Sequence, residues 1–276
     1  MIVNIAPTVK CYSEKVEYML LKKEACNNLM LGLMGRLAKS KVDSILGYVE
    51  DNGRVIYAFM QTPPNNWILS DVENVDLRAI QAVVNFLKEG KYKVPGVLGP
   101  VKDVDAFIGM WGNEKSTVHM NQLIYQLDAV KVSPSTKGKL IQATDKDNNL
   151  LAGWLYQFGE EANEIISIPQ AQTLASNFIK NGSAYLWKIN GRIVSMVNRS
   201  RETRNGATIN AVFTPDVHKR NGYATNSVAA LSQKLLDEGF QFCSLYTDKL
   251  NSTSNNIYKK IGYYEVGSSI VYHFED

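Results

Sequence analysis

A loop between a predicted strand and a predicted helix in the C-terminal half has a composition suited to holding a phosphate group. The loop contains Lys219, Arg220 and Gly222, and the helix begins at Thr225. Unpaired N–H groups and the dipole at a helix start favour an anion, and a glycine lets the backbone approach it closely. Many basic loops with one glycine bind no phosphate, so the loop alone does not establish such a site. It contains neither GxxxxGKS/T nor GxGxxG, which argues against the common nucleotide-binding loops.

The second candidate for chemistry is Tyr258, which lies on a short predicted helix after the next strand. That strand ends near Asp248, Asn251 follows in the turn, and Ser254 begins the helix. A tyrosine O–H on a helix that faces the adjacent strand can donate a proton to a leaving thiolate. The alternative is a buried aromatic side chain that only packs on the sheet.

Together the two stretches resemble the GNAT superfamily of N-acyltransferases. Residues 219–224, KRNGYA, correspond to the family's phosphate loop Q/R-x-x-G-x-G/A, with lysine in place of the usual glutamine or arginine. The preceding VFTP at 212–215 resembles a VYTP stretch of bacterial members. The family's later element, N-x-x-S-N-x-x-Y-x-x-x-G-F/Y, is matched by Asn251, Ser254, Asn255, Tyr258, Gly262 and Tyr263. Order and spacing agree over roughly residues 139–276.

The resemblance implies an acetyl-CoA-dependent N-acetyltransferase, in which an amine attacks the thioester carbonyl directly. Backbone groups of Val212 and Thr214 would pair with the pantetheine arm, and Tyr258 would protonate the leaving thiolate. Asn251 would touch the cofactor or hold the loop in place. The residues implied to bind acetyl-CoA or coenzyme A are Val212, Phe213, Thr214, Lys219, Arg220, Asn221, Gly222, Tyr223, Ala224, Thr225, Asn251 and Asn255.

The general base is not evident, because the strand on which some family members carry a glutamate reads ATINA at 207–211. Asn210 is the catalytic candidate on this strand, where it would orient a water. Glu202 and Asp248 are alternatives on neighbouring strands, but each is more simply explained as a surface or turn residue. Proximity in a tight complex supplies much of the rate, so a missing base does not exclude catalysis.

Two other functions stay open at this point. One is the transfer of a longer acyl group, as in glycine N-acyltransferase-like proteins, which would need a wider thioester pocket. The other is an acyl-CoA sensor without catalysis, which the absent strand carboxylate favours and the presence of Tyr258 disfavours. The acceptor is expected to be a small-molecule or peptide amine that the sequence does not identify.

The C-terminal half must position these residues with alternating strands and helices in the order β-α-α-β-β-β-α-β-α-β. Asn190-Gly191 indicates a hairpin, and periodicity indicates the remaining elements. The expected strands are Lys139–Thr144, Ala184–Ile189, Arg192–Ser200, Ala207–Thr214, Phe240–Thr247 and Tyr264–Phe274, and the expected helices are Asn148–Glu161, Gln170–Lys180, Thr225–Glu238 and Ser254–Ile261.

The N-terminal half is expected to have a similar but degenerate α/β architecture. We expect one helix over Glu14–Lys39, a hairpin around Asp51-Asn52-Gly53, and a loop that contains Pro95-Gly96 and Gly99-Pro100. The polar segment Val130–Gly138 divides a domain of residues 1–130 from a catalytic domain of residues 131–276. This plan resembles bacterial proteins in which a smaller degenerate GNAT-like domain precedes an active GNAT fold, a mixed central sheet flanked by helices. Residues 1–130 contain no phosphate loop, so no second coenzyme site is expected.

Composition limits the class of protein. The chain has 276 residues, 45% apolar and 21% charged, as in an ordinary globular protein. A net charge of +3 favours neither nucleic acid nor a membrane surface as a partner. The three cysteines form no CxxC pair and the three histidines are scattered, so we expect no metal and a reducing, cytoplasmic location. The start of the chain does not resemble a signal peptide, and a homodimer stays an open alternative.

Overall fold

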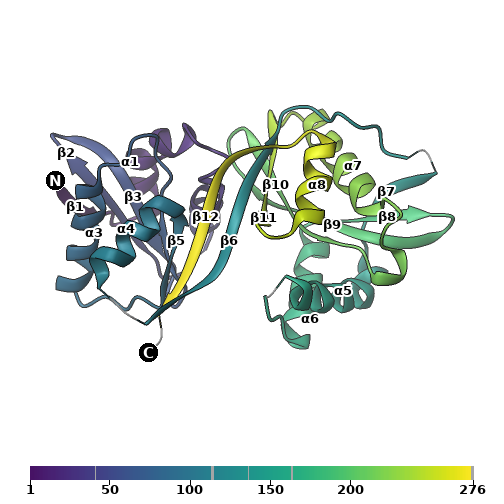
Figure 1. The fold of residues 1–276 in the computed structure, drawn as a ribbon, viewed down its shortest axis with the longest axis horizontal. Coiled ribbons are helices and arrows are strands. Elements are labelled where there is room, and N and C mark those ends of the chain that lie inside the picture. The colour runs from purple at the N-terminus through teal and green to yellow at the C-terminus, as the bar shows by residue number, and fades with distance from the viewer. Residues whose placement is uncertain (41, 113–114, 136, 163, 275–276) are drawn as a thin grey trace. The chain divides into compact units, whose positions relative to one another are not determined.

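A computed structural model describes residues 1–40, 42–112, 115–135, 137–162 and 164–274 (Figure 1). The chain divides into two compact units. The first contains residues 1–124 together with the segment from Val266 onward, and the second contains residues 125–265. The predicted domains, 1–130 and 131–276, differ from this division. The segment from Val266 onward was predicted to belong to the second domain, but it belongs to the first unit.

The first unit has a mixed sheet with the strand order β1-β2-β3-β4-β5-β12-β6. Strand β4 is parallel to β5, while β12 is antiparallel to β5, with Ser269 opposite Pro100 and His273 opposite Gly96. This pairing is the reason that the C-terminal segment belongs to the first unit. The strands are β1 (Ile2–Ile5), β2 (Ile45–Asp51), β3 (Arg54–Gln61), β4 (Trp67–Leu69), β5 (Gly96–Pro100), β6 (Ser116–Leu127) and β12 (Tyr264–Phe274).

Both faces of this sheet are covered, because side chains on β3 alternate between two cores. Tyr57 and Phe59 pack with helices α3 (Leu77–Glu89) and α4 (Val101–Trp111), while Ala58 and Met60 pack with α1 (Val9–Leu21) and α2 (Asn28–Leu37). Successive side chains of a strand point to opposite faces, so an unbroken apolar run such as this one marks a strand that is buried on both sides. Strands β6 and β12 contribute residues to both units.

Two expectations for the N-terminal half are wrong. The helix expected over Glu14–Lys39 is two helices, α1 and α2, which are separated by a turn in which Asn27 binds backbone groups through its side chain. The loop expected around Pro95-Gly96 and Gly99-Pro100 is strand β5, which lies inside the sheet. A Cβ on Gly96 would lie 2.3 Å from the carbonyl oxygen of Tyr272. This glycine therefore permits close strand contact and does not mark a loop.

The second unit contains the mixed sheet β6-β11-β10-β9-β8-β7 flanked by helices, which confirms the predicted α/β class. Helices α5 and α6 pack on one face with Leu186, Met196 and Phe213, and α7 lies against β8, β9, β10 and β11. The elements are β7 (Gly138–Gln142), α5 (Asn148–Glu161), α6 (Ile168–Lys180), β8 (Ala184–Ile189), β9 (Arg192–Glu202), β10 (Gly206–Phe213), α7 (Tyr223–Asp237), β11 (Phe242–Asp248) and α8 (Ser252–Ile261).

Across the part of the chain that the structure describes, every helix is too short or too polar to cross a membrane.

Candidate functional site

Strands β10 and β11 diverge on the way to the predicted phosphate loop. Their parallel pairing includes Gly206 to Thr208 on β10, whereas β10 continues to Phe213. On the other side of β10, the register with β9 shifts between Asn210 and Phe213, and Ala211 has a φ of +48°. This bulge kinks the strand, as an extra unpaired residue does in general. Beyond Thr208, the edge of β10 that faces β11 is therefore open to a ligand that pairs with backbone groups.

The loop after β10 presents a row of backbone donors to solvent. Arg220 and Gly222 have φ values of +64° and +74°, and α7 starts after Gly222 without a side-chain cap. Within the described residues, the N–H groups from Arg220 to Thr225 have no hydrogen-bond partner, and the first helical bond is donated by Asn226 to Gly222. Arg220 to Gly222 are exposed and the next three residues are half-buried. Such a row of aligned N–H groups is a binding site for an anion.

The ammonium group of Lys219 forms ion pairs with two carboxylates. Its Nζ lies 2.7 Å from Oε1 of Glu161 on α5 and 2.7 Å from Oδ1 of Asp216. Hydrogen bonds to Asp216 and Glu161 raise the pKa of Lys219. Two carboxylates therefore balance the charge of Lys219 in this arrangement, and a role of its side chain in binding a phosphate stays a prediction. Arg220 is the exposed cation of the loop.

A buried cluster of hydroxyl groups holds the two ends of the loop together, and the sequence did not indicate it. Thr214 donates to Oγ of Ser195 on β9 at 2.9 Å, and Ser195 donates to the carbonyl of Phe213 at 3.0 Å. Ser227, in the second turn of α7, lies 3.3 Å from Ser195 and donates to the carbonyl of Ala224. The cluster thus links β9, the end of β10 and the start of α7. In the sequence, a serine that stands alone among apolar residues is the signal that could have indicated such a cluster.

Asn210 is exposed on β10, as a residue that contacts substrate must be. Its Oδ1 accepts a 2.8 Å hydrogen bond from Nδ2 of Asn198, whose own Oδ1 accepts from Ser183 at 2.7 Å. Asn198 is buried and lies opposite Asn210 in the β9–β10 register. This chain orients the Asn210 amide, so that its NH₂ group is left to donate to a ligand or a water.

Asn251 and Asn255 hold the turn between β11 and α8. The side chain of Asn251 caps α8 by accepting from the N–H of Ser254 at 3.0 Å. The Nδ2 of Asn255 donates to the carbonyls of Asp248 and Lys249, while its buried Oδ1 has no partner among the described residues. These contacts give both residues a role in positioning the turn, and they leave the buried Oδ1 of Asn255 unpaired among the described residues.

Tyr258 lies on α8 and is 7% exposed. Its ring centroid lies 6.0 Å from that of Tyr263 and 6.4 Å from that of Tyr125. Burial raises the pKa of Tyr258 to about 12, and a hydrogen bond with Ser254 opposes the shift. The hydroxyl therefore stays protonated at neutral pH, which a proton donor requires.

Both carboxylates considered as a base have other partners in the structure. Glu202 lies opposite Ala207 at the far end of β10 and forms an ion pair with Arg199 at 3.2 Å. The Oδ1 of Asp248 accepts from the N–H of Leu250, so Asp248 is a turn residue. Asn210 stays the predicted catalytic residue on β10.

In the first unit, the start of helix α3 differs from the start of α7. The corresponding helix after its own parallel strand, α3, is capped by Asp76, whose side chain accepts from the N–H of Arg78 at 2.9 Å. A capping carboxylate satisfies the helix donors and repels a phosphate. The expectation that residues 1–130 form no second coenzyme site stays a prediction.

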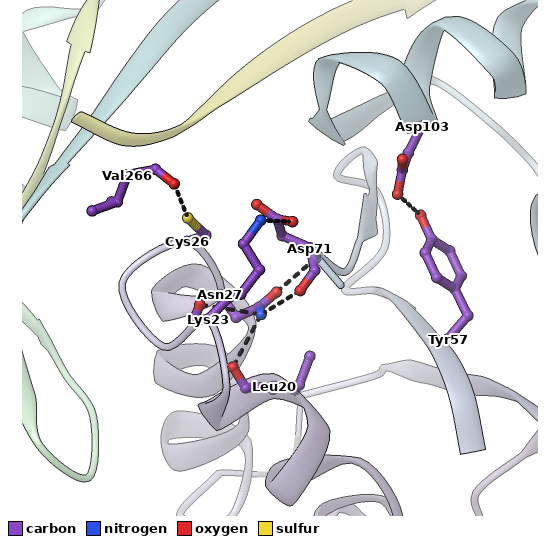
Figure 2. Close-up of polar contacts among 8 residues, drawn as sticks. All are labelled: Leu20, Lys23, Cys26, Asn27, Tyr57, Asp71, Asp103 and Val266. Carbon is purple, nitrogen blue, oxygen red and sulfur yellow. Dashed lines mark hydrogen bonds and ion pairs between the residues drawn. The ribbon is translucent and has the colours of Figure 1, made fainter. Parts of the chain in front are cut away.

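The first unit instead contains a buried polar cluster that the sequence reading did not single out (Figure 2). Lys23 forms an ion pair with Asp71, and Asn27 donates to the Leu20 and Asp71 carbonyls. Nearby, Tyr57 donates to Asp103 at 2.8 Å. Burial raises the pKa of Asp103 to about 6, although the Tyr57 hydrogen bond opposes it. The contacts of Lys23 and Asn27 with Asp71 attach the turn between α1 and α2 to the residues that follow β4.

The histidines and cysteines form no further site. His119 and His273 are stacked with centroids 4.3 Å apart, so two of the three histidines that looked scattered in the sequence are neighbours. Within the described ranges, no three metal-ligand side chains gather. No disulfide joins any of the three cysteines within the described residues, and burial raises the pKa of Cys243 to about 12, which makes it unreactive.

Comparisons with known proteins give a consistent result. Residues 189–271 match the model of a family described as FR47-like protein, and no curated protein sequence matches the chain. An acetyltransferase of the GNAT family from Colwellia psychrerythraea is 11% identical with a TM-score of 0.60, over 100% of both chains. A tandem GNAT protein from the clavulanic acid biosynthesis pathway is 12% identical with a TM-score of 0.61, over 98% of each chain. A GCN5-related N-acetyltransferase from Sphaerobacter thermophilus is 11% identical with a TM-score of 0.61, over 98% of this chain and 94% of that one.

Proposed function

Because the chain has the GNAT fold over its whole length and an FR47-like segment at residues 189–271, we propose that it is an acetyl-CoA-dependent N-acetyltransferase acting on a primary amine. The fold is one that carries out acyl transfer in general. The observation that supports the finer proposal is the start of α7, where the N–H groups from Arg220 to Thr225 are unpaired and solvent-accessible after a splayed strand pair. A pyrophosphate fits this row better than a neutral ligand does.

The proposed cofactor contacts come mainly from the backbone. The N–H groups from Arg220 to Thr225 would hold the pyrophosphate, and the open edge of β10 at Val212 to Thr214 would pair with the pantetheine arm. Gly222 would let the loop adopt the conformation that exposes these N–H groups, because a φ of +74° costs free energy for residues with a Cβ. Lys219, Asn251 and Asn255 would position the surrounding loops through the contacts described above. When bound, acetyl-CoA supplies the acetyl group as an activated thioester.

Two side chains would manage the protons of direct transfer. The acceptor nitrogen forms a bond to the carbonyl carbon while the carbon–sulfur bond breaks, so the amine loses one proton and the sulfur gains one. Tyr258 would give its proton to the sulfur. Asn210 would orient a water that takes the proton from the amine. This role follows from the fixed orientation of the Asn210 amide, which is set by Asn198. Cysteines that form no disulfide among the described residues fit a reducing cytoplasm as the location.

The direct test is turnover. Purified protein is mixed with acetyl-CoA and a panel of primary amines that includes small amines, amino acids and peptide N-termini. Release of the thiol is followed with a thiol reagent. Mass spectrometry identifies the acetylated product. Octanoyl- and benzoyl-CoA replace acetyl-CoA in parallel to test for a longer acyl donor. If coenzyme A binds but no amine is acylated from any donor, catalysis is ruled out for this panel and an acyl-CoA sensor becomes the better explanation.

A further inference from the structure

Two lysines lie directly opposite each other on neighbouring strands of the second unit. The antiparallel register of β7 and β8 pairs Lys139 with Lys188. Opposite residues of an antiparallel pair point to the same face with Cβ atoms about 4.5–5.5 Å apart, and like charges there are destabilising. Such a pair is expected to be tolerated where a negative group offsets the repulsion.

The two lysines line a cavity with a volume of about 360 Å³, together with Lys137, Gly138, Asn190 and Gly191. Among the described residues, no carboxylate lies within 4.0 Å of the ammonium group of any of the three lysines, although other lysines of the unit, such as Lys219 and Lys234, form ion pairs. No side chain in the lining is acidic, aromatic or aliphatic apart from the lysine stems. A ligand here would be recognised by charge and hydrogen bonding.

The tight turn of the β8–β9 hairpin completes the cavity. Asn190 and Gly191 both have positive φ, +48° and +80°, as a two-residue hairpin turn requires. Asn190 is exposed and belongs to the cavity lining with the three lysines. The cavity volume lies within the range of small-molecule sites. None of its lining residues belongs to the loop at 219–225.

We propose that this cavity is a second anion site, which binds the phosphate monoester group of a small ligand. A phosphate dianion offsets the repulsion between Lys139 and Lys188, and its three acceptor oxygens suit several ammonium donors. The group could come from the 3′-phosphate of coenzyme A or from a separate phosphorylated compound. The chemistry of the site is the same in both cases, and it does not depend on acyl transfer.

The first experiment measures thermal unfolding with inorganic phosphate as the probe. The full-length protein is compared in phosphate and in sodium chloride of equal ionic strength, as wild type, as Lys139→Gln/Lys188→Gln, and as the matched control Lys146→Gln/Lys180→Gln. The control removes the same charge from exposed positions outside the cavity. We expect a saturable rise in Tm in phosphate for the wild type and the control, and none for the cavity variant.

The cavity variant should also have a higher Tm than the wild type in dilute chloride, because the like-charge pair is gone. Equal rises in phosphate and chloride would mean screening only and would overturn the proposal. A phosphate effect that persists in the cavity variant would overturn it as well.

The second experiment identifies the source of the phosphate by calorimetry with coenzyme A and dephospho-coenzyme A. If the 3′-phosphate occupies the site, its removal should weaken binding about tenfold in the wild type and should have no effect in the cavity variant. If both ligands bind the wild type equally while inorganic phosphate still binds, the site takes a separate phosphorylated compound. If inorganic phosphate does not bind, the proposal fails, whatever the outcome of the acetyltransferase assay.

Discussion

Tyr258 and Asp103 are buried groups whose pKa is raised by the same cause, the loss of hydration. The consequences differ because Tyr258 stays protonated at neutral pH, whereas Asp103 loses its proton. Tyr258, with a pKa of about 12, keeps the proton that it is proposed to donate. Asp103, with a pKa of about 6, must ionise inside the protein at neutral pH, which costs stability.

Replacement of Tyr258 by phenylalanine should lower kcat by at least about 10²-fold, the usual contribution of a positioned proton donor. The dissociation constant of coenzyme A should change little, since the phosphate contacts remain. In the wild type, the high pKa of Tyr258 predicts no loss of activity from its ionisation below about pH 11. Steady-state kinetics across pH and calorimetry with coenzyme A measure both effects.

The matched control is Tyr263→Phe, which removes the same atom from a neighbouring buried ring. The Tyr263 hydroxyl lies 2.8 Å from Oγ of Ser232, so this variant should lose about 1 kcal/mol of stability and keep its kcat. If Tyr258→Phe leaves kcat unchanged in an active enzyme, Tyr258 is only a packing residue.

Asp103 predicts a pH-dependent stability. Its pKa in the folded protein, about 6, lies above the ordinary value of 3.8, so its contribution is fully present below about pH 4 and is lost as pH rises through 6. Asp103→Asn should therefore raise the free energy of unfolding at pH 7 by up to roughly 3 kcal/mol and flatten its fall between pH 4 and 7. Urea unfolding at several pH values measures this.

The control for that series is Asp105→Asn, on an exposed position of the same helix. It removes the same charge and should change stability by less than about 0.5 kcal/mol. A slope that is equally steep in wild type and Asp103→Asn would mean that Asp103 is not the titrating group.

Helices α3 and α7 each follow a strand that has a parallel neighbour, but their starts have opposite chemistry. Asp76 caps α3 and occupies its donors, whereas α7 follows Gly222 and has no side-chain cap. The hydroxyl cluster of Thr214, Ser195 and Ser227 holds the α7 start in place without occupying those donors. An uncapped helix start is a cost that a bound anion can offset.

Gly222→Ala should therefore weaken coenzyme A binding more than it lowers stability. Nothing but the Asn226 side chain, at 3.9 Å, would contact the added Cβ, so the direct cost is the strain of φ +74°, roughly 1–2 kcal/mol. Relief of that strain would turn the loop donors away from the ligand. We expect at least about a tenfold increase in the dissociation constant of coenzyme A, measured by calorimetry.

The control is Gly53→Ala in the β2–β3 turn of the first unit. Gly53 has a φ of +76° and free space around its Cβ position, so it carries the same backbone strain. Its loss of stability should be similar and its affinity for coenzyme A unchanged. Equal affinities for the two variants would contradict a role of the α7 start in binding.

At the level of the molecule, the C-terminal strand β12 is an integral part of the sheet of the first unit. Strand β12 lies between β5 and β6 from Val266 onward, although helix α8 before it belongs to the second unit. Cys26 donates from Sγ to the carbonyl of Val266, and a Cβ on Gly267 would lie 2.8 Å from that sulfur. The strand is therefore packed tightly and is part of the sheet of the first unit.

A fragment of residues 1–130 should consequently fail to fold, because its sheet would lack the strand between β5 and β6. Circular dichroism should detect little cooperative unfolding in the fragment. Addition of a synthetic peptide of residues 264–274 should restore at least part of the transition. A fragment that unfolds cooperatively by itself would show that β12 is dispensable for the first unit.

The sequence by itself determined the features that depend on neighbours in the chain. The glycine in the loop between residues 219 and 225, the turn at Asn251, and the placement of Tyr258 on the helix after β11, ten residues beyond the end of that strand, all follow from local propensity and spacing. They were sufficient for the resemblance to the GNAT superfamily, and the similar solved structures share the fold that this resemblance implies. The strand and helix order of the C-terminal half was likewise predicted, since each element carries its own periodicity and its own turn residues.

Only the tertiary structure decided the features whose partners are distant in sequence. Glu161 neutralises Lys219 from 58 residues away, and Ser195 reaches Ser227 across 32 residues. Strand β5 looked like a loop because of its glycines. Gly96 permits close approach by Tyr272 of β12, more than 160 residues further along the chain, and Gly99 permits close approach by Leu69 of β4. Local patterns describe which conformation a segment prefers, but the charge state, burial and pairing of a side chain depend on what folding brings beside it, and these set the chemistry of the site.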